Sequence, residues 1–98
     1  MNNRPPPWSA QEDDLIVTDY LTLLRDHTAG VKINKAKTRR ALLPLLNQRS
    51  ETSVEFKRMN ISAVLESLGR PWLPGYRPAK NYQRSLAAAV TRNPLFSM

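Results

Sequence analysis

Most of the side chains in this sequence that could do chemistry are cationic, and they are concentrated after residue 29. Residues 1–29 carry two basic and five acidic side chains, a formal charge of −3, whereas residues 30–98 carry 13 basic and three acidic ones, a formal charge of +10. Together they give the formal net charge of +7. A charge split of this size predicts a basic surface that attracts polyanions, although it also suits a basic surface that serves only solubility.

The sequence offers little for catalysis. The only histidine, His27, follows an acidic amphipathic stretch and has no evident second ligand, so we expect it to be exposed. The chain has no cysteine, which excludes disulfides, thiol catalysis and thiolate metal sites. Its three glycines form no phosphate-binding loop, and Asp13 and Asp14 suit the positive end of a helix dipole. We therefore predict no enzymatic activity, no cofactor and no metal site.

The elements that must position the cations are predicted to be helices. Apolar residues recur at helical spacing, and 98 residues allow one domain. Ser9 and Glu12 have the spacing of a capping box, Asn34 can cap a second helix, and Thr52 with Glu55 is a second possible capping box. We expect helices at about residues 10–27, 35–43, from 50 or 52 to 68, and 81–92.

Proline and glycine mark the boundaries between these helices. Pro44 should interrupt the second helix, whereas Gly30 and Gly69 should follow the ends of the first and third. Residues 70–80 should wrap the body as an extended proline-rich loop, with a type II turn at Pro74-Gly75. Its anchors should be Trp72, Leu73 and Tyr76.

The third helix is predicted to have three differently used faces. The core face should hold Val54, Ile61, Val64, Leu65 and Leu68. The opposite flank should hold Glu55, Arg58, Ser62 and Glu66, and a strip of Phe56, Asn60 and Ala63 should pack on the 70–80 loop.

A basic second helix, a turn at residues 47–50 and a longer third helix predict a helix-turn-helix, in which the start of the third helix enters the major groove of DNA. Any three-helix domain has such a turn, so the basic charge is what favours this interpretation. Base reading is assigned to Thr52, Ser53 and Arg58, and Ser50 with Arg49 should hold phosphate at the turn. The phosphate contacts are assigned to Lys35, Lys37, Arg39, Arg40, Arg49, Lys57, Arg58, Arg77 and Lys80.

Two resemblances to known families follow from longer strings. Trp8-Ser9-x-x-Glu12-Asp13, followed by Gln48-Arg49-Ser50-x-x-Ser53-Val54-x-x-Lys57, resembles the tryptophan-led helix and recognition-helix entry of Myb/SANT-type domains. The sequence also resembles the N-terminal head domain of bacterial McrA-like HNH restriction endonucleases and related multidomain proteins. This second resemblance is carried by Asn34-Lys35, Ala41-Leu42-Leu43-Pro44-Leu45-Leu46-Asn47-x-Arg49-Ser50, Ser53-Val54-Glu55-Phe56-Lys57-x-x-Asn60-Ile61-Ser62-Ala63-Val64-Leu65 and Gly75-Tyr76-Arg77-Pro78-x-x-Asn81-Tyr82. It implies a DNA-associated role in restriction or defence, without the nuclease, because an HNH site needs several histidines.

The predicted protein is thus an all-α, four-helix domain with a helix-turn-helix-like three-helix core and a wrapped proline-rich loop. Residues 1–8 should form a flexible arm, 9–93 the nucleic-acid-binding domain and 94–98 a tail. Its predicted function is non-catalytic binding of double-stranded DNA, with a nuclease domain or another protein as a further partner. The alternatives are an assembly module, in which the acidic first helix meets a basic surface, and an RNA-binding module. With no apolar run long enough for a membrane span or signal, we expect a cytoplasmic location. The strings leave Asn60 and Tyr82 open between structural and binding roles.

Overall fold

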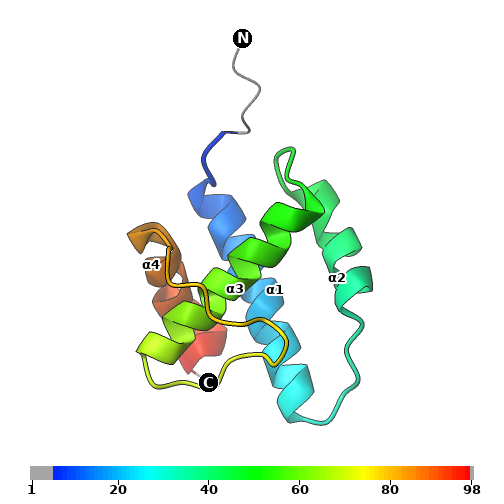
Figure 1. Ribbon diagram of the computed structural model, residues 1–98, viewed down its shortest axis with the longest axis vertical. Helices are drawn as coiled ribbons and strands as arrows, with labels where there is room; N and C mark the ends of the chain where they lie inside the picture. The colour runs from blue at the N-terminus through cyan, green and yellow to red at the C-terminus, as the bar shows by residue number, and fades with distance from the viewer. Residues whose placement is uncertain (1–5, 98) are drawn as a thin grey trace.

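The computed structural model describes residues 6–97, and these form an all-α domain of four helices with no strand among them. Figure 1 shows α1 and α3 at the centre, with α2 on one side of this pair and α4 on the other. The predicted all-α class and the four helices are confirmed. The helices are α1 (Ala10–Thr28), α2 (Lys35–Leu42), α3 (Glu51–Ser67) and α4 (Arg84–Arg92), with short 3-10 turns η1 (Leu43–Leu45) and η2 (Pro94–Ser97).

The start of α1 has the predicted capping box. The Ser9 hydroxyl accepts a hydrogen bond from the Glu12 amide at 3.1 Å, and the Ser9 amide donates to the Glu12 carboxylate at 3.1 Å. The apolar stripe that follows is buried, and Ile16, Val17 and Tyr20 are fully inaccessible. Local sequence therefore determines where this helix begins and which face it buries.

The boundaries of α2 and α3 follow the predicted signals with one exception. The Asn34 side chain caps α2, and Pro44 lies in η1, where the α-helix gives way to a tighter turn. The second capping box, at Thr52, is wrong. Ser50 is extended and its hydroxyl accepts from the Ser53 amide at 3.1 Å, so α3 begins at Glu51 and Thr52 lies inside its first turn.

More of α3 is buried than the sequence predicted. Val54, Ile61, Val64 and Leu65 are buried as expected, but Leu68 is 45 % exposed because it lies at the end of the helix, next to Gly69. Arg58 and Ser62, assigned to the solvent side, are both completely inaccessible. The reason is that α1, α2, α4 and the segment 70–83 all pack around α3.

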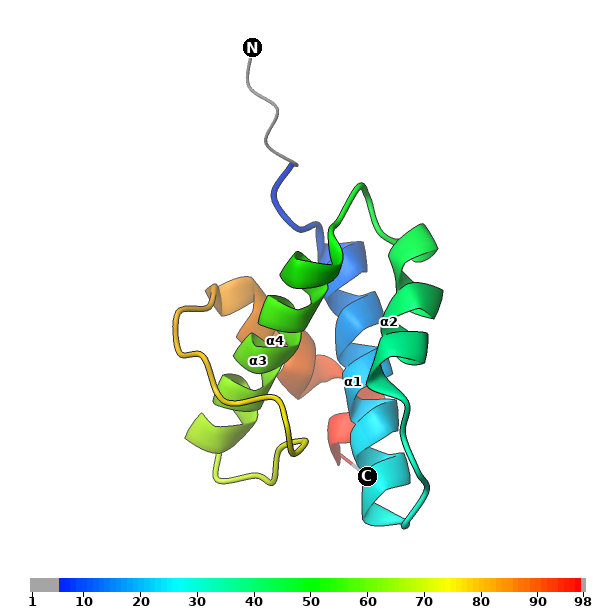
Figure 2. The same ribbon diagram turned by 45° about the vertical axis from the view of Figure 1, so that its right-hand side comes forward.

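The proline-rich segment 70–83 wraps α3 as an ordered loop, visible in yellow and orange in Figures 1 and 2. Its turn is of the predicted kind, since the Tyr76 amide donates to the Leu73 carbonyl at 3.2 Å and Gly75 has a φ of +92°. Leu73 and Tyr76 are buried anchors, and the Asn60 side chain donates to the Ala79 carbonyl at 2.7 Å. Asn60 thus has a structural partner in this loop.

Both ends of the predicted domain differ from the expectation. In the predicted arm 1–8, residues 1–5 lie outside the described residues, whereas Trp8 is half-buried beneath the cationic groups of Arg49 and Lys57. At the other end α4 begins at Arg84, not near Asn81, because Gln83 is extended and acts as its N-cap. Residues 94–97 of the predicted tail form η2, which packs on α1, and its Leu95 and Phe96 are half-buried against the core. Met98 lies outside the described residues.

No helix within residues 6–97 combines the length and apolar character needed to cross a membrane.

Replacing Tyr20 with Phe should destabilise the fold. The Tyr20 hydroxyl shares a 2.6 Å hydrogen bond with Ser62 and accepts from the Leu73 amide at 2.8 Å, all in the interior. Tyr20→Phe leaves that amide unpaired, so the free energy of unfolding should fall by about 1–3 kcal/mol in urea denaturation. Tyr82→Phe is the matched control, because Tyr82 is half-buried and its hydroxyl bonds to no other residue in 6–97. Equal effects of the two substitutions would contradict the assignment.

Candidate nucleic-acid interface

Arg49, predicted to hold phosphate, is instead the partner of Glu12. Its guanidinium donates to both carboxylate oxygens of Glu12, at 2.9 and 2.8 Å, and its side chain is only 3 % exposed. The same guanidinium donates to the carbonyls of Pro6 and Pro7, and the Asn47 amide donates to Glu12 at 2.9 Å. Arg49 therefore connects the start of α1 with the turn before α3 through hydrogen bonds and an ion pair.

These contacts change the acidity of Glu12. Hydrogen bonds from Arg49 and from the Asn47 and Ser9 amides stabilise its ionised form against the cost of burial. They lower the pKa of Glu12 from 4.5 to about 2.

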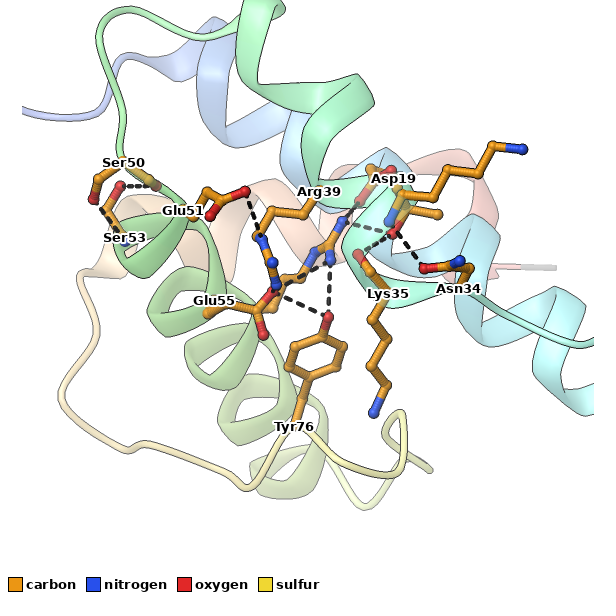
Figure 3. A network of polar contacts seen from close by, with 12 residues as sticks. Asp19, Asn34, Lys35, Arg39, Ser50, Glu51, Ser53, Glu55 and Tyr76 are labelled. Carbon is orange, nitrogen blue, oxygen red and sulfur yellow. Dashed lines mark hydrogen bonds and ion pairs between the residues drawn. The ribbon is translucent and has the colours of Figure 1, made fainter.

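Arg58, the strongest candidate for base reading, lies inside the protein with no exposed surface. It donates to Asp19 at 2.7 Å and to the Tyr76 hydroxyl at 2.8 Å, and it lies 3.6 Å from Glu55. Figure 3 shows that Asp19, Glu55 and Tyr76 come from α1, α3 and the segment 70–83, respectively. In this position Arg58 cannot contact a DNA base, so we remove it from the proposed contacts. The burial of Arg58 could not be predicted, because the sequence does not show that the segment 70–83 covers this flank of α3.

Lys57 is also internal, with 9 % of its surface exposed. Its ammonium lies 3.8 Å from a carboxylate oxygen of Asp13, which is 1 % exposed. Burial raises the pKa of the Asp13 carboxyl and lowers the pKa of the Lys57 ammonium, and each charge partly offsets the effect on the other. The role of Lys57 in this arrangement is to balance a buried acid.

The predicted recognition helix exposes little positive charge. Arg39 pairs with Glu55 at 3.1 Å and Glu51 at 3.6 Å. Ser50 and Ser53 are engaged with each other at the helix cap, since the Ser53 hydroxyl donates to the Ser50 carbonyl at 2.9 Å. The exposed side of the first turns of α3 includes Thr52 and a Phe56 that is 48 % exposed. Of the three predicted base-reading residues, only Thr52 keeps a side chain exposed and free of these contacts.

Most of the cations that remain available lie on α2 and on the segment 70–83, or within a few residues of them. Within residues 6–97, eight exposed cations form no ion pair with another residue. Arg25 and Arg70 line a cleft at the C-terminal end of α1. The other six lie within residues 32–40 and 77–84: Lys32, Lys37, Arg40, Arg77, Lys80 and Arg84. We call these six the unpaired cations; Lys37, Arg40, Arg77 and Lys80 belong to the predicted site, whereas Lys32 and Arg84 do not. Lys32 and Arg84 could have been included, because each is a basic residue close in sequence to the predicted cluster.

Lys35 connects α2 with the segment 70–83. Its ammonium donates to the Pro74 carbonyl at 2.8 Å and lies 4.7 Å from the centre of the Tyr76 ring. The start of α2 is therefore in contact with the turn that precedes Arg77. This places the cations of α2 and those of the segment 70–83 on adjoining parts of the molecule.

The structure places the histidine and the acidic side chains that were considered for catalysis or metal binding. His27 is exposed, as expected. Within residues 6–97, no group of three or more His, Cys, Asp or Glu side chains is placed to hold a metal ion.

Comparison with known proteins assigns no family, because no family model, curated protein or solved structure matches this chain. The resemblances to Myb/SANT-type domains and to McrA-like head domains remain predictions from the quoted strings.

Removing Arg58 should cost far more stability than removing an unpaired cation. Arg58→Ala leaves Asp19 without its partner, and breaking a buried ion pair costs about 3–5 kcal/mol. Arg40→Ala, on the exposed side of α2, should change the free energy of unfolding by less than about 0.5 kcal/mol. Urea unfolding followed by circular dichroism measures both. If the two variants were equally stable, the structural role of Arg58 would be refuted.

The stability contributed by Glu12 should disappear in acid. Because its pKa falls from 4.5 to about 2 on folding, this contribution is fully present above pH 4.5 and is lost as the pH falls toward 2. Glu12→Gln should therefore be less stable than the parent protein by about 2 kcal/mol at neutral pH, with the difference shrinking across that window. Burial raises the pKa values of Asp13 and Asp19, so their contributions to stability change with pH in the opposite direction. Both residues are present in the parent protein and in Glu12→Gln, so their contributions cancel in the difference.

The control is Glu66→Gln, which alters an exposed carboxylate that pairs with no residue in 6–97. Its stability should follow that of the parent protein at every pH. A constant difference between Glu12→Gln and the parent from neutral pH to pH 2 would rule out the lowered pKa.

Proposed function

We propose that this chain is a non-catalytic module that binds double-stranded DNA through the unpaired cations of α2 and of the segments beside it. The observation that carries the proposal is the distribution of charge between the interior and the surface. Within residues 6–97, ion pairs engage six of the eight acidic side chains but only five cations. The positive excess of the sequence is thereby left at the surface, where it can release counterions from a polyanion.

The position of these cations suits contact with a phosphate backbone. Lys37 and Arg40 are three residues apart on α2 and share one side of it. Arg77 and Lys80 lie on the segment 70–83, which adjoins the start of α2 through Lys35. Phosphate contacts from two adjoining segments would fix the orientation of the module on a duplex.

In this proposal α2, the turn at residues 46–50 and α3 act as a helix-turn-helix, but with fewer base contacts than the sequence predicted. Thr52 and Phe56 are the exposed groups available to base edges at the start of α3. Arg39 partly neutralises Glu51 and Glu55, which would otherwise repel the DNA backbone. Affinity should therefore come mainly from phosphate contacts, with weak dependence on sequence.

The resemblance to McrA-like head domains supports placing this module in a bacterial restriction or defence protein, in which a separate nuclease would act on the DNA. The assembly alternative has less support in its original form. It requires an acidic α1 surface, but four of the five acidic side chains of α1 pair with cations of the same chain. RNA remains the second alternative, because a phosphate contact does not by itself distinguish the two nucleic acids.

Fluorescence anisotropy with labelled duplex DNA, single-stranded DNA and duplex RNA tests the proposal. The protein should bind duplex DNA most tightly, with an affinity that falls steeply as salt increases. Lys37→Ala and Arg77→Ala should each weaken binding to every sequence and reduce the salt slope by about one. Arg25→Ala removes the same charge from an exposed position on α1 and should have little effect.

Three results would count against this function. Absence of duplex binding at low salt would eliminate it. Tighter binding to RNA would favour the RNA-binding alternative. An equal loss of affinity in Arg25→Ala would mean that net charge alone, and not the unpaired cations, is responsible for binding.

A further inference from the structure

An apolar cleft lies at the C-terminal end of α1, and the proposed DNA contacts do not use it. Its volume is about 490 Å³. Leu21 and Leu24 of α1 and Leu65 of α3 line it, with Leu95 and Phe96 of η2 on another side. Figure 2 shows η2, in red, beside the half of α1 that leads to this end.

Among residues 6–97, the charged side chains that line this cleft are both cationic. Arg25 and Arg70 line it, and no Asp or Glu does. The Arg70 guanidinium stacks 4.2 Å from the centre of the Phe96 ring and donates to the Phe96 carbonyl at 3.2 Å, which holds it beside the apolar lining. Arg25 is exposed and has no ion-pair partner within residues 6–97.

We infer that this cleft binds a short peptide segment of a partner protein, one that combines apolar side chains with acidic residues. The apolar lining would receive the apolar side chains, because removing them from water is favourable. The two guanidinium groups would pair with the carboxylates, for which arginine is well suited. The inference is independent of the DNA-binding proposal, since Arg25 and Arg70 are not among the six cations to which the DNA contacts are assigned.

Two exposed apolar side chains lie close in sequence to lining residues of the cleft, which favours a peptide over a small molecule. Val31, 52 % exposed, is two residues beyond the lining residue Ala29, and Leu68, 45 % exposed, is two residues before Arg70. Such neighbouring apolar side chains would continue the contact with an extended or helical segment. A basic peptide would be repelled, because no acid in the lining could neutralise it.

Selection from a random-sequence peptide library displayed on phage tests this inference with the full chain as bait. The enriched peptides should combine Leu, Ile or Phe with Asp or Glu, and as synthetic peptides they should shift the amide resonances of the cleft residues in NMR titrations. Arg25→Glu should weaken their binding by about tenfold or more. Arg84→Glu, the same change at an exposed arginine outside the cleft, should weaken binding by less than about twofold.

The opposite results overturn the inference. One such result is a library that gives no enrichment over an empty bait, and another is the enrichment of basic peptides. A third is that the selected peptides bind Arg25→Glu as tightly as they bind the parent chain. Each of these results would overturn the inference. Decanoate serves as a small-molecule probe. If it shifts the same resonances at concentrations as low as the peptides require, the cleft is a site for small amphiphilic anions and the peptide inference is wrong.

Discussion

The buried guanidinium of Arg58 is the constraint on which the rest of this small fold depends. An internal charge is stable only when opposite charges and hydrogen-bond acceptors surround it. Here the acceptors come from α1, α3 and the segment 70–83, at Asp19, Glu55 and Tyr76. Each of these segments is therefore held in one position relative to the others, beyond what the apolar contacts alone would specify.

A second ion pair has the same effect just before the N-terminal end of α3. Arg49 holds Glu12 at the start of α1, and its remaining donors reach the carbonyls of Pro6 and Pro7. Trp8 lies against the guanidinium of Arg49 and the ammonium of Lys57, so an aromatic ring shields both cations from solvent. The acidic first helix is thus held to the basic remainder of the chain by paired charges.

Internal pairing links the fold to the proposed function. A chain of formal charge +7 that mixed its acids and bases evenly on the surface would present a weak field to a polyanion. Four acids of α1 pair with Arg49, Lys57, Arg58 and Arg92, and Glu51 and Glu55 pair with Arg39. Within residues 6–97, Lys37 and Arg40 of α2 and Arg77 and Lys80 of the segment 70–83 therefore face solvent without an acidic partner. The same ion pairs that stabilise the domain therefore shape the charge of its surface.

The sequence by itself determined the helices and most of their ends, because caps, prolines and glycines act within a few residues of where they stand. Ser9, Asn34 and Gly75 were identified correctly for this reason. What only the tertiary structure decided is which cations are free: Arg58 and Arg40 look alike in sequence, yet one is buried and the other is exposed. The difference arises because Asp19 and Tyr76, distant along the chain, meet Arg58 when α1 and the segment 70–83 pack on α3. Helical periodicity places a residue on a face, but the segments that cover that face come from elsewhere in the chain.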